Sequence, residues 1–153
     1  MISSRQRKYA LVTGASSGIG REYAAQLAAK GYDLVMAGNR DEENRAAARE
    51  IAARYGVRTL PLCMDLSEPD AAVKLHAETS ARGIEIGVLV CNAGIAQVKL
   101  FTDTTDEDWR RMMAVDLDGA FYACRAVLPG MIHRKYGRIL LVSSMWGQTG
   151  GSC

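Results

Sequence analysis

The chain reads Thr13-Gly14-Ala15-Ser16-Ser17-Gly18-Ile19-Gly20 between an apolar run at residues 9–12 and a helix-forming segment at residues 19–30. Glycines at such a junction permit a tight turn and let backbone N–H groups approach a pyrophosphate closely. The helix that follows adds unpaired N–H donors and a partial positive charge at its first turn. The spacing is G-x-x-x-G-x-G rather than the general dinucleotide fingerprint G-x-G-x-x-G. Taken alone, the stretch indicates either a phosphate cradle or an ordinary turn.

Outward from this stretch, short apolar runs alternate with longer segments rich in helix formers. The apolar runs predict β-strands at residues 9–12, 33–37, 57–63, 86–91 and 138–143. Helices are expected at residues 19–30 and 42–55, from Ser67 as an N-cap, and from Thr104 or Thr105 through to His133. The runs are continuously apolar, as in parallel strands that are covered on both faces. The pattern predicts an α/β fold with a doubly wound, Rossmann-like parallel sheet.

Composition indicates one globular domain over residues 1–153, because 48% of the residues are hydrophobic and 24% are charged. A net charge of +2 is too small to indicate a nucleic-acid partner. No apolar run reaches the roughly 20 residues that a membrane helix needs, and no signal peptide is recognisable. The cysteines are scattered without paired histidines, which predicts no metal site and reduced thiols in the cytoplasm; they are Cys63, Cys91, Cys124 and Cys153.

Two further predicted strand ends carry polar or glycine residues. The third strand leads into Met64-Asp65-Leu66, and the fourth leads into Cys91-Asn92-Ala93-Gly94. Ligands bind at the carboxyl ends of strands in doubly wound sheets, so both groups are expected beside the glycine stretch. With T-G-x-x-x-G-x-G before them and V-S-S after the fifth strand, this ordered set resembles the short-chain dehydrogenase/reductase family over about residues 8–153.

The resemblance implies an NAD(P)-dependent oxidoreductase that transfers hydride between nicotinamide and a ketone or alcohol. It implies a sheet of about five strands in the order 3-2-1-4-5. The glycine stretch would hold the cofactor pyrophosphate through Gly14, Ser16, Ser17, Gly18, Ile19 and Gly20.

The same resemblance places Asp65 and Leu66 at the adenine ring, and Asn92, Ala93 and Gly94 along the cofactor cleft, where they would also brace the sheet. The residues themselves leave other interpretations open. Asp65 would then only cap the next helix, Asn92 would only form a turn, and Gly94 would only relieve backbone crowding.

Two positions match the catalytic machinery of the family. Ser144 matches the serine that orients and polarises the substrate carbonyl, unless it is only a turn residue at a strand end. Asp116 stands in Val115-Asp116-Leu117, where the family usually has an asparagine that holds a water of the proton relay. A carboxylate accepts hydrogen bonds but cannot donate them. Asp116 therefore either serves the relay as an acceptor or only satisfies local backbone groups.

The family also uses Tyr-x-x-x-Lys, in which the tyrosine gives its proton to the carbonyl oxygen and the lysine lowers the pKa of that tyrosine. None of the six tyrosines here has a lysine four residues later. Family spacing from Ser144 places the tyrosine just past Cys153. The chain is therefore expected to be truncated at its C-terminus relative to the family, without the last strands and the helices that usually form a homo-oligomer interface.

Three hypotheses follow from that expectation. The first is the family's oxidoreductase, acting on a small carbonyl or alcohol substrate. The second is a non-catalytic dinucleotide-binding module. The third is a fragment whose fifth strand, at residues 138–143, lies exposed at the sheet edge and promotes aggregation.

The residues after the second strand, Gly38-Asn39-Arg40, favour NADP over NAD. NAD-preferring members place an acidic residue here, which accepts from the ribose 2′-OH. Arg40 suits a 2′-phosphate instead, unless it is only a solvated charge at a helix start. Ser17 argues for NAD, because many NADP-dependent members carry a basic residue there. The stretch at residues 144–148 is similar to reductases of the 3-oxoacyl-carrier-protein type, and Trp146 within it belongs either to a substrate pocket or to the core.

Overall fold

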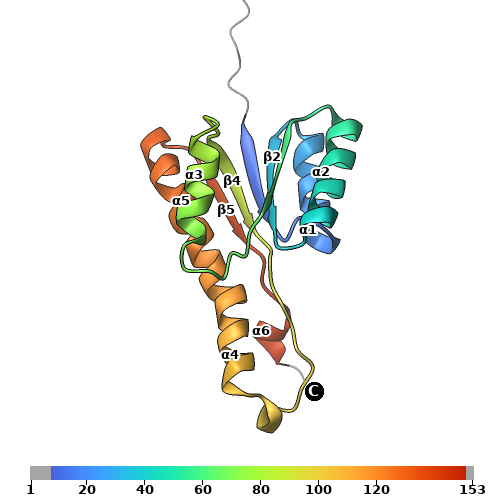
Figure 1. The fold of residues 1–153 in the computed structure, drawn as a ribbon, viewed down its shortest axis with the longest axis vertical. Helices are drawn as coiled ribbons and strands as arrows, with labels where there is room; N and C mark the ends of the chain where they lie inside the picture. Colours follow the sequence, from blue (N-terminus) through green and yellow to red (C-terminus); the bar gives the residue numbers. More distant parts are fainter. Residues whose placement is uncertain (1–7, 151–153) are drawn as a thin grey trace, which may run out of the picture.

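A computed structural model of the chain describes residues 8–150 and shows one parallel sheet. The strands lie in the order β3-β2-β1-β4-β5, which confirms the predicted topology (Figure 1). Strand β3 starts two residues later than predicted, and β5 ends two residues earlier. The strands are β1 (Tyr9–Thr13), β2 (Asp33–Gly38), β3 (Thr59–Cys63), β4 (Ile86–Cys91) and β5 (Arg138–Leu141).

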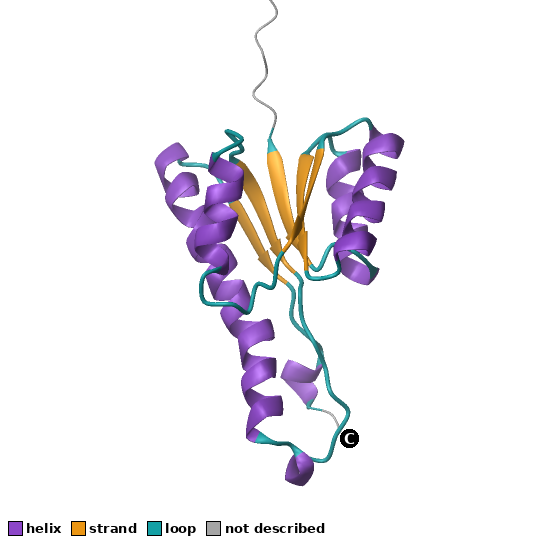
Figure 2. Cartoon of the chain, in the orientation of Figure 1, coloured by secondary structure: helices purple, strands orange, loops and turns teal. Residues whose placement is uncertain are grey.

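Helices cover both faces of the sheet, as Figures 1 and 2 show. Helices α1 (Gly18–Ala29) and α2 (Asp41–Tyr55) bury small side chains such as Ala24 and Ala48 against one face. Helices α3 (Ala71–Ser80) and α5 (Gly119–Arg134) bury Leu75 and Val127 against the other. Because both faces are covered, the central strands are buried along nearly their whole length, and this explains their continuously apolar sequences.

The predicted N-cap of the third helix is wrong. Helix α3 begins at Ala71 after Asp70, and not after Ser67. The Oδ1 atom of Asp65 accepts hydrogen bonds from the backbone N–H and the hydroxyl of Ser67, at 2.9 and 2.7 Å. These bonds hold Ser67 in a turn, so its side chain is not available to cap a helix.

The long helix predicted from Thr104 or Thr105 is present but is divided into three parts. Helix α4 (Asp106–Met113) passes through a π-helical segment (Ala114–Asp118) into α5. Thr105 is the N-cap of α4, and it forms a reciprocal capping box with Asp108. The N-cap at Thr105 and the end of the helix near His133 therefore confirm the sequence prediction. Nothing in the sequence indicated the π-helical segment.

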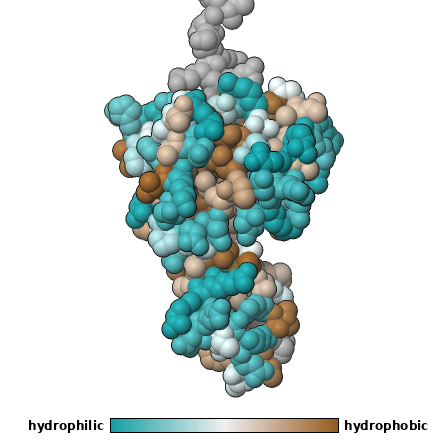
Figure 3. Space-filling view, viewed as in Figure 1, coloured by the Kyte–Doolittle hydropathy of each residue, from teal (hydrophilic) through white to brown (hydrophobic). Residues whose placement is uncertain are grey.

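The first part of this helix extends past the carboxyl edge of the sheet. There it lies with a 3₁₀ turn (Phe101–Asp103) and the short helix α6 (Trp146–Thr149), which form the lower part of the molecule in Figures 1 to 3. Many large apolar side chains in this part are exposed, among them Phe101 at 84%. Within residues 8–150, no helix combines the length and the apolar character that crossing a bilayer requires.

Candidate functional site

A cleft of about 560 Å³ opens at the carboxyl ends of β1, β2, β3 and β4. This is the edge at which doubly wound sheets bind their ligands. Segments that are far apart in the sequence meet here because the strands run parallel. The cleft is lined by Gly14, Ser16, Ser17, Ala37, Gly38, Asn39, Arg40, Met64, Asp65, Leu66, Ser67, Asn92, Ala93, Gly94, Ile95, Arg111 and Val115.

The glycine stretch turns sharply between β1 and α1. Gly14 has a φ of +64°, a conformation that favours glycine, and its N–H donates to the carbonyl of Ala37 at 2.8 Å. A Cβ atom on Gly20 would lie 2.3 Å from the carbonyl oxygen of Gly14. Two of the glycines are thus required by the packing of the turn itself, so that the loop backbone forms one wall of the cleft.

The same stretch leaves the first turn of α1 ready for an anion. Ser17 is the N-cap residue of α1, and its side chain makes no capping hydrogen bond. A helix start has N–H groups without helical partners and carries a partial positive charge. Ser16 and Ser17 line the cleft, whereas Ile19 is 65% exposed and Gly18 and Ile19 are not among the lining residues. The donors at this helix start fit a phosphate or pyrophosphate group.

Thr13 and Asn92 join the glycine stretch to the end of β4. The hydroxyl of the buried Thr13 accepts from the backbone N–H groups of Asn92 and Ala93, at 2.9 and 3.0 Å. The Asn92 side chain donates to the carbonyl oxygens of Thr13 and Gly14, at 3.2 and 3.5 Å. Asn92 therefore braces the sheet as the resemblance implies. Thr13, which was only part of the motif in the sequence, is a second member of this brace.

Arg40 lies across the glycine stretch from the end of β2. Its guanidinium donates to the hydroxyl of Ser17 at 3.3 Å and pairs with Glu43 at 2.7 Å. Arg40, which favours NADP in the sequence, and Ser17, which argues for NAD, are therefore neighbours in the structure. Together with Asn39 they form a corner of the cleft that suits a phosphate ester.

Asp65 and Leu66 form the opposite wall. One carboxylate oxygen of Asp65 is occupied by Ser67, whereas the other has no hydrogen-bond partner within residues 8–150. The next residue, Leu66, also lines the cleft and is buried, at 7% exposed. A carboxylate acceptor next to an apolar residue fits the edge of a heterocyclic base that bears an amino group.

The residues predicted for catalysis lie outside the lining of the cleft. Asp116, in the π-helical segment, accepts the backbone N–H of Ile95 at 2.8 Å. Ser144 lies in the turn after β5, where its hydroxyl accepts from the N–H of Trp146 at 3.2 Å. Trp146 is 61% exposed, so it is not part of the core.

Several lining residues carried no signal in the sequence. Ile95, Arg111 and Val115 reach the cleft because the segment after β4 lies along α4. No periodicity relates that segment to the helix, so only the fold could bring them together.

The described cysteines and acidic residues form no further reactive centre in the described part of the chain. Burial and the neighbouring Cys124 thiol raise the pKa of Cys91, the residue before Asn92, to about 12, which makes Cys91 a packing residue and not a nucleophile. Cys153 lies outside the described residues, and among those described no three His, Cys, Asp or Glu side chains are arranged to hold a metal ion.

The sheet order and the cleft at its carboxyl edge together define a Rossmann-like α/β fold. The chain belongs to the short chain dehydrogenase family, whose model matches residues 8–153. It is 39% identical over 147 residues to the uncharacterized oxidoreductase YmfI of Bacillus subtilis, covering 95% of this chain and 60% of the relative. It is 38% identical over 145 residues to the 3-oxoacyl-[acyl-carrier-protein] reductase FabG of Aquifex aeolicus, covering 95% of this chain and 58% of the relative.

Solved structures agree with this family. The L-sorbose reductase from Gluconobacter frateurii, complexed with NADPH and L-sorbose, superposes with a TM-score of 0.90 at 27% identity. That match covers 95% of this chain and 55% of the reductase. A short-chain dehydrogenase from Sphingobium yanoikuyae in complex with NADPH gives 0.84 at 30% identity, covering 92% and 55%. The chain thus spans between about half and 60% of the length of these relatives.

Proposed function

We propose that the chain is the cofactor-binding part of an NAD(P)-dependent oxidoreductase of the short-chain dehydrogenase type. The observation that carries this proposal is the meeting of four parts in one cleft: the glycine stretch with the start of α1, Arg40, Asp65, and the Asn92 to Gly94 segment. Each part suits a different group of a dinucleotide. The relatives that are named reductases, and the two structures complexed with NADPH, support the same reaction class.

The fit assigns each part a task in binding. The N–H groups at the start of α1 hold the pyrophosphate, and Gly14, whose own N–H is used by Ala37, allows its close approach because it has no side chain. Asp65 accepts from the amino group of the adenine ring, and Asn92 keeps the two strand ends at a constant separation. When bound, the nicotinamide would supply or accept the hydride that interconverts a ketone and an alcohol.

NADP is the proposed cofactor rather than NAD. Arg40 and the Ser17 hydroxyl lie 3.3 Å apart at the corner where a ribose 2′-phosphate would emerge. A guanidinium binds a phosphate through two parallel hydrogen bonds, and the Arg40 ion pair with Glu43 is exposed and therefore weak. Replacing Arg40 with glutamine is expected to weaken NADPH binding more than NADH binding.

Ser144 and Asp116 are the proposed catalytic side chains in this sequence. Ser144 would polarise the carbonyl of a ketone substrate. Asp116 would support the proton relay only as an acceptor, because a carboxylate has no proton to donate, and one of its oxygens already accepts from the N–H of Ile95. The tyrosine and lysine that complete the family's chemistry have no counterpart among the 153 residues.

The position of Ser144 and Asp116 outside the lining of the cleft supports a second candidate function for these residues, dinucleotide binding without turnover. Both candidates share the cofactor cleft and differ only in catalysis. We keep the cytoplasm as the proposed location, because the described cysteines are unpaired.

Fluorescence of NADPH during titration with the purified chain tests the shared part of the proposal. We expect saturable binding that Gly14→Val abolishes, because the larger side chain would collide with Ala93 and Asn92. The absence of saturable binding by the unmodified chain would overturn both candidates. Loss of NADPH absorbance after a ketone is added then separates them, since sustained consumption supports the enzyme and excludes the inactive module.

A further inference from the structure

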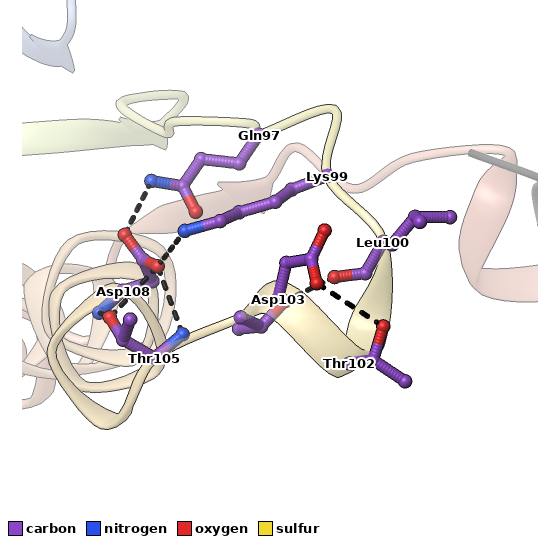
Figure 4. A network of polar contacts seen from close by, with 8 residues as sticks. Gln97, Lys99, Leu100, Thr102, Asp103, Thr105 and Asp108 are labelled. Atoms are coloured by element: carbon purple, nitrogen blue, oxygen red, sulfur yellow. Dashed lines mark hydrogen bonds and ion pairs between the residues drawn. The ribbon is translucent and has the colours of Figure 1, made fainter.

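Arg111 projects into the cleft from α4, although nothing in the glycine motif or the strand ends points to it. It lines the cleft together with Val115, four residues later, and with Ile95 from the segment after β4. That segment is held against α4 by two sets of contacts. The carboxylate of Asp116 accepts from Ile95, and that of Asp108 accepts from Gln97 and Lys99, at 3.1 and 2.6 Å (Figure 4).

The guanidinium of Arg111 is available to a ligand. Within residues 8–150 it has no hydrogen bond or ion pair, although three acidic residues open the same helix. Asp106 pairs with Arg110, the residue before Arg111, at 3.3 Å. Asp108 is occupied by Lys99, Gln97 and the Thr105 cap, as Figure 4 shows. Two adjacent arginines of one helix therefore have different surroundings, Arg110 being paired in solvent and Arg111 unpaired at the cleft.

The other parts of the cleft already provide for the phosphates. The start of α1 serves a pyrophosphate, and the Arg40–Ser17 corner serves a phosphate ester. The wall near Arg111 is different, because Val115 lies one turn later on the same helical stretch and Ile95 is bonded to Asp116 beside it, and both are apolar lining residues. A planar guanidinium beside apolar side chains is suited to the face of an aromatic ring and not to an anion.

We propose that Arg111 stacks on the adenine ring of the dinucleotide and is a determinant of cofactor affinity in this chain. The inference rests on the proposed function, because it needs a dinucleotide in the cleft. Asp65 would then read the edge of the base while Arg111 covers its face. The positive charge of Arg111 is secondary to its planar shape.

Titration of NADPH and of adenosine 2′,5′-bisphosphate into the full 153-residue chain, followed by calorimetry, tests this inference. The variants are Arg111→Gln, Arg111→Lys and the matched control Arg110→Gln. Because the stacking contact is lost, Arg111→Gln should raise the Kd of both ligands about tenfold, which corresponds to about 1.4 kcal/mol. Arg110→Gln should leave both values within about twofold, since its partner Asp106 lies in solvent.

The lysine variant identifies the kind of contact. A lysine keeps the charge but lacks the plane, so Arg111→Lys should bind nearly as weakly as Arg111→Gln, and the loss should persist at high salt. Full rescue by lysine, or a loss that disappears at high salt, would show an ion pair with a phosphate and overturn the stacking proposal. Equal affinities in Arg111→Gln and the unmodified chain would overturn the role of Arg111 while leaving the proposed function intact. Failure of the unmodified chain to bind would instead remove the proposed function on which the inference rests.

Discussion

Thr13 shows how one side chain can hold two parts of a site together. Its hydroxyl is buried between the end of β1 and the start of the Asn92 segment, and it accepts two backbone N–H groups there. It also lies 3.4 Å from the carbonyl oxygen of Val90, to which it donates. A buried N–H group that loses its acceptor destabilises a protein more than the original bond stabilised it.

Replacing Thr13 with valine should therefore destabilise the chain strongly, although the two side chains have similar shapes. We expect the free energy of unfolding to fall by about 2–4 kcal/mol, because the N–H groups of Asn92 and Ala93 are left without acceptors. Urea denaturation followed by circular dichroism measures this loss. Thr13→Ser keeps the hydroxyl and should lose only about 1 kcal/mol through the missing methyl group. Equal losses in the two variants would contradict the hydrogen-bonding role.

Gly20 makes a different contribution, since it needs space and not a special backbone conformation. An added Cβ would lie 2.3 Å from the Gly14 carbonyl oxygen and 2.4 Å from the amide nitrogen of Asn92. Gly20→Ala should lower stability by about 1–3 kcal/mol through overpacking, and it should also weaken NADPH binding because the loop must move. Thermal unfolding and the NADPH titration measure the two effects.

The control for Gly20 is Gly31, which lies at the far end of α1. Gly31 has a φ of +83°, and no atom lies within 4 Å of an added Cβ. Gly31→Ala should lose about 1–2 kcal/mol of stability through backbone strain alone. Its NADPH affinity should stay unchanged. A parallel loss of affinity in both variants would mean that stability, and not loop position, governs binding.

At the scale of elements, the start of α4 positions the segment that follows β4. Asp108 is the centre of this arrangement, because its carboxylate accepts from Lys99, Gln97 and the backbone of Thr105 (Figure 4). These contacts, the hydrogen bond from Lys99 first among them, hold the pKa of Asp108 well below its usual range. The ionised form is thus favoured in the folded state.

A lowered pKa makes this arrangement sensitive to acid. The unfolded chain releases the Asp108 proton near pH 3.8, so the stabilisation is present above that pH and is lost as the pH falls toward the lower folded value. Asp108→Asn keeps a side-chain oxygen that can accept from Thr105 but removes the charge. The stability of this variant should therefore fall less steeply than that of the unmodified chain as the pH is lowered below about 4. Denaturation midpoints across this pH range measure the difference.

Asp106→Asn is the matched control for that experiment. It removes a carboxylate from the same helical turn, but one whose contact is a single exposed pair with Arg110 at 3.3 Å. Its acid profile should follow that of the unmodified chain. If both variants changed the profile alike, the overall charge of the helix would be responsible and not the Asp108 contacts.

At the scale of the whole molecule, β5 is an edge of the sheet. Leu141 in this strand is 65% exposed, and α5 beside it exposes Ile132 at 71%. A sheet edge with apolar side chains can pair with another chain. This arrangement is the one that the third hypothesis from the sequence anticipated for an isolated chain.

We expect the 153-residue chain to self-associate as its concentration rises, and Leu141→Lys to reduce this association. A lysine on an edge strand places a charge where another strand would pair. Sedimentation velocity over a range of concentrations measures the effect. Val73→Lys is the control, because Val73 is also 65% exposed but lies on helix α3. A monomer at all concentrations, or equal effects of the two substitutions, would contradict an edge-driven association.

Much of the fold was predictable because its signals are local. Continuous apolar runs predicted every strand to within two residues, since strands such as β2 are buried on both faces. Thr105 was one of two cap candidates in the sequence, and its partner Asp108 is only three residues away. The Ser67 prediction was wrong because a competing partner, Asp65, lies only two residues away and holds Ser67 in a turn.

The sequence by itself determined the family, the strand order implied by it, and the glycine stretch with Asp65 and Asn92 at strand ends. These features depend on backbone conformation and burial, which neighbouring residues dictate. Only the tertiary structure decided that Thr13 bridges two strands, that Arg40 meets Ser17, and that Arg111 lines the cleft. Each of these contacts joins residues from separate elements, and their distances follow from how helices and strands pack and not from any pattern along the chain.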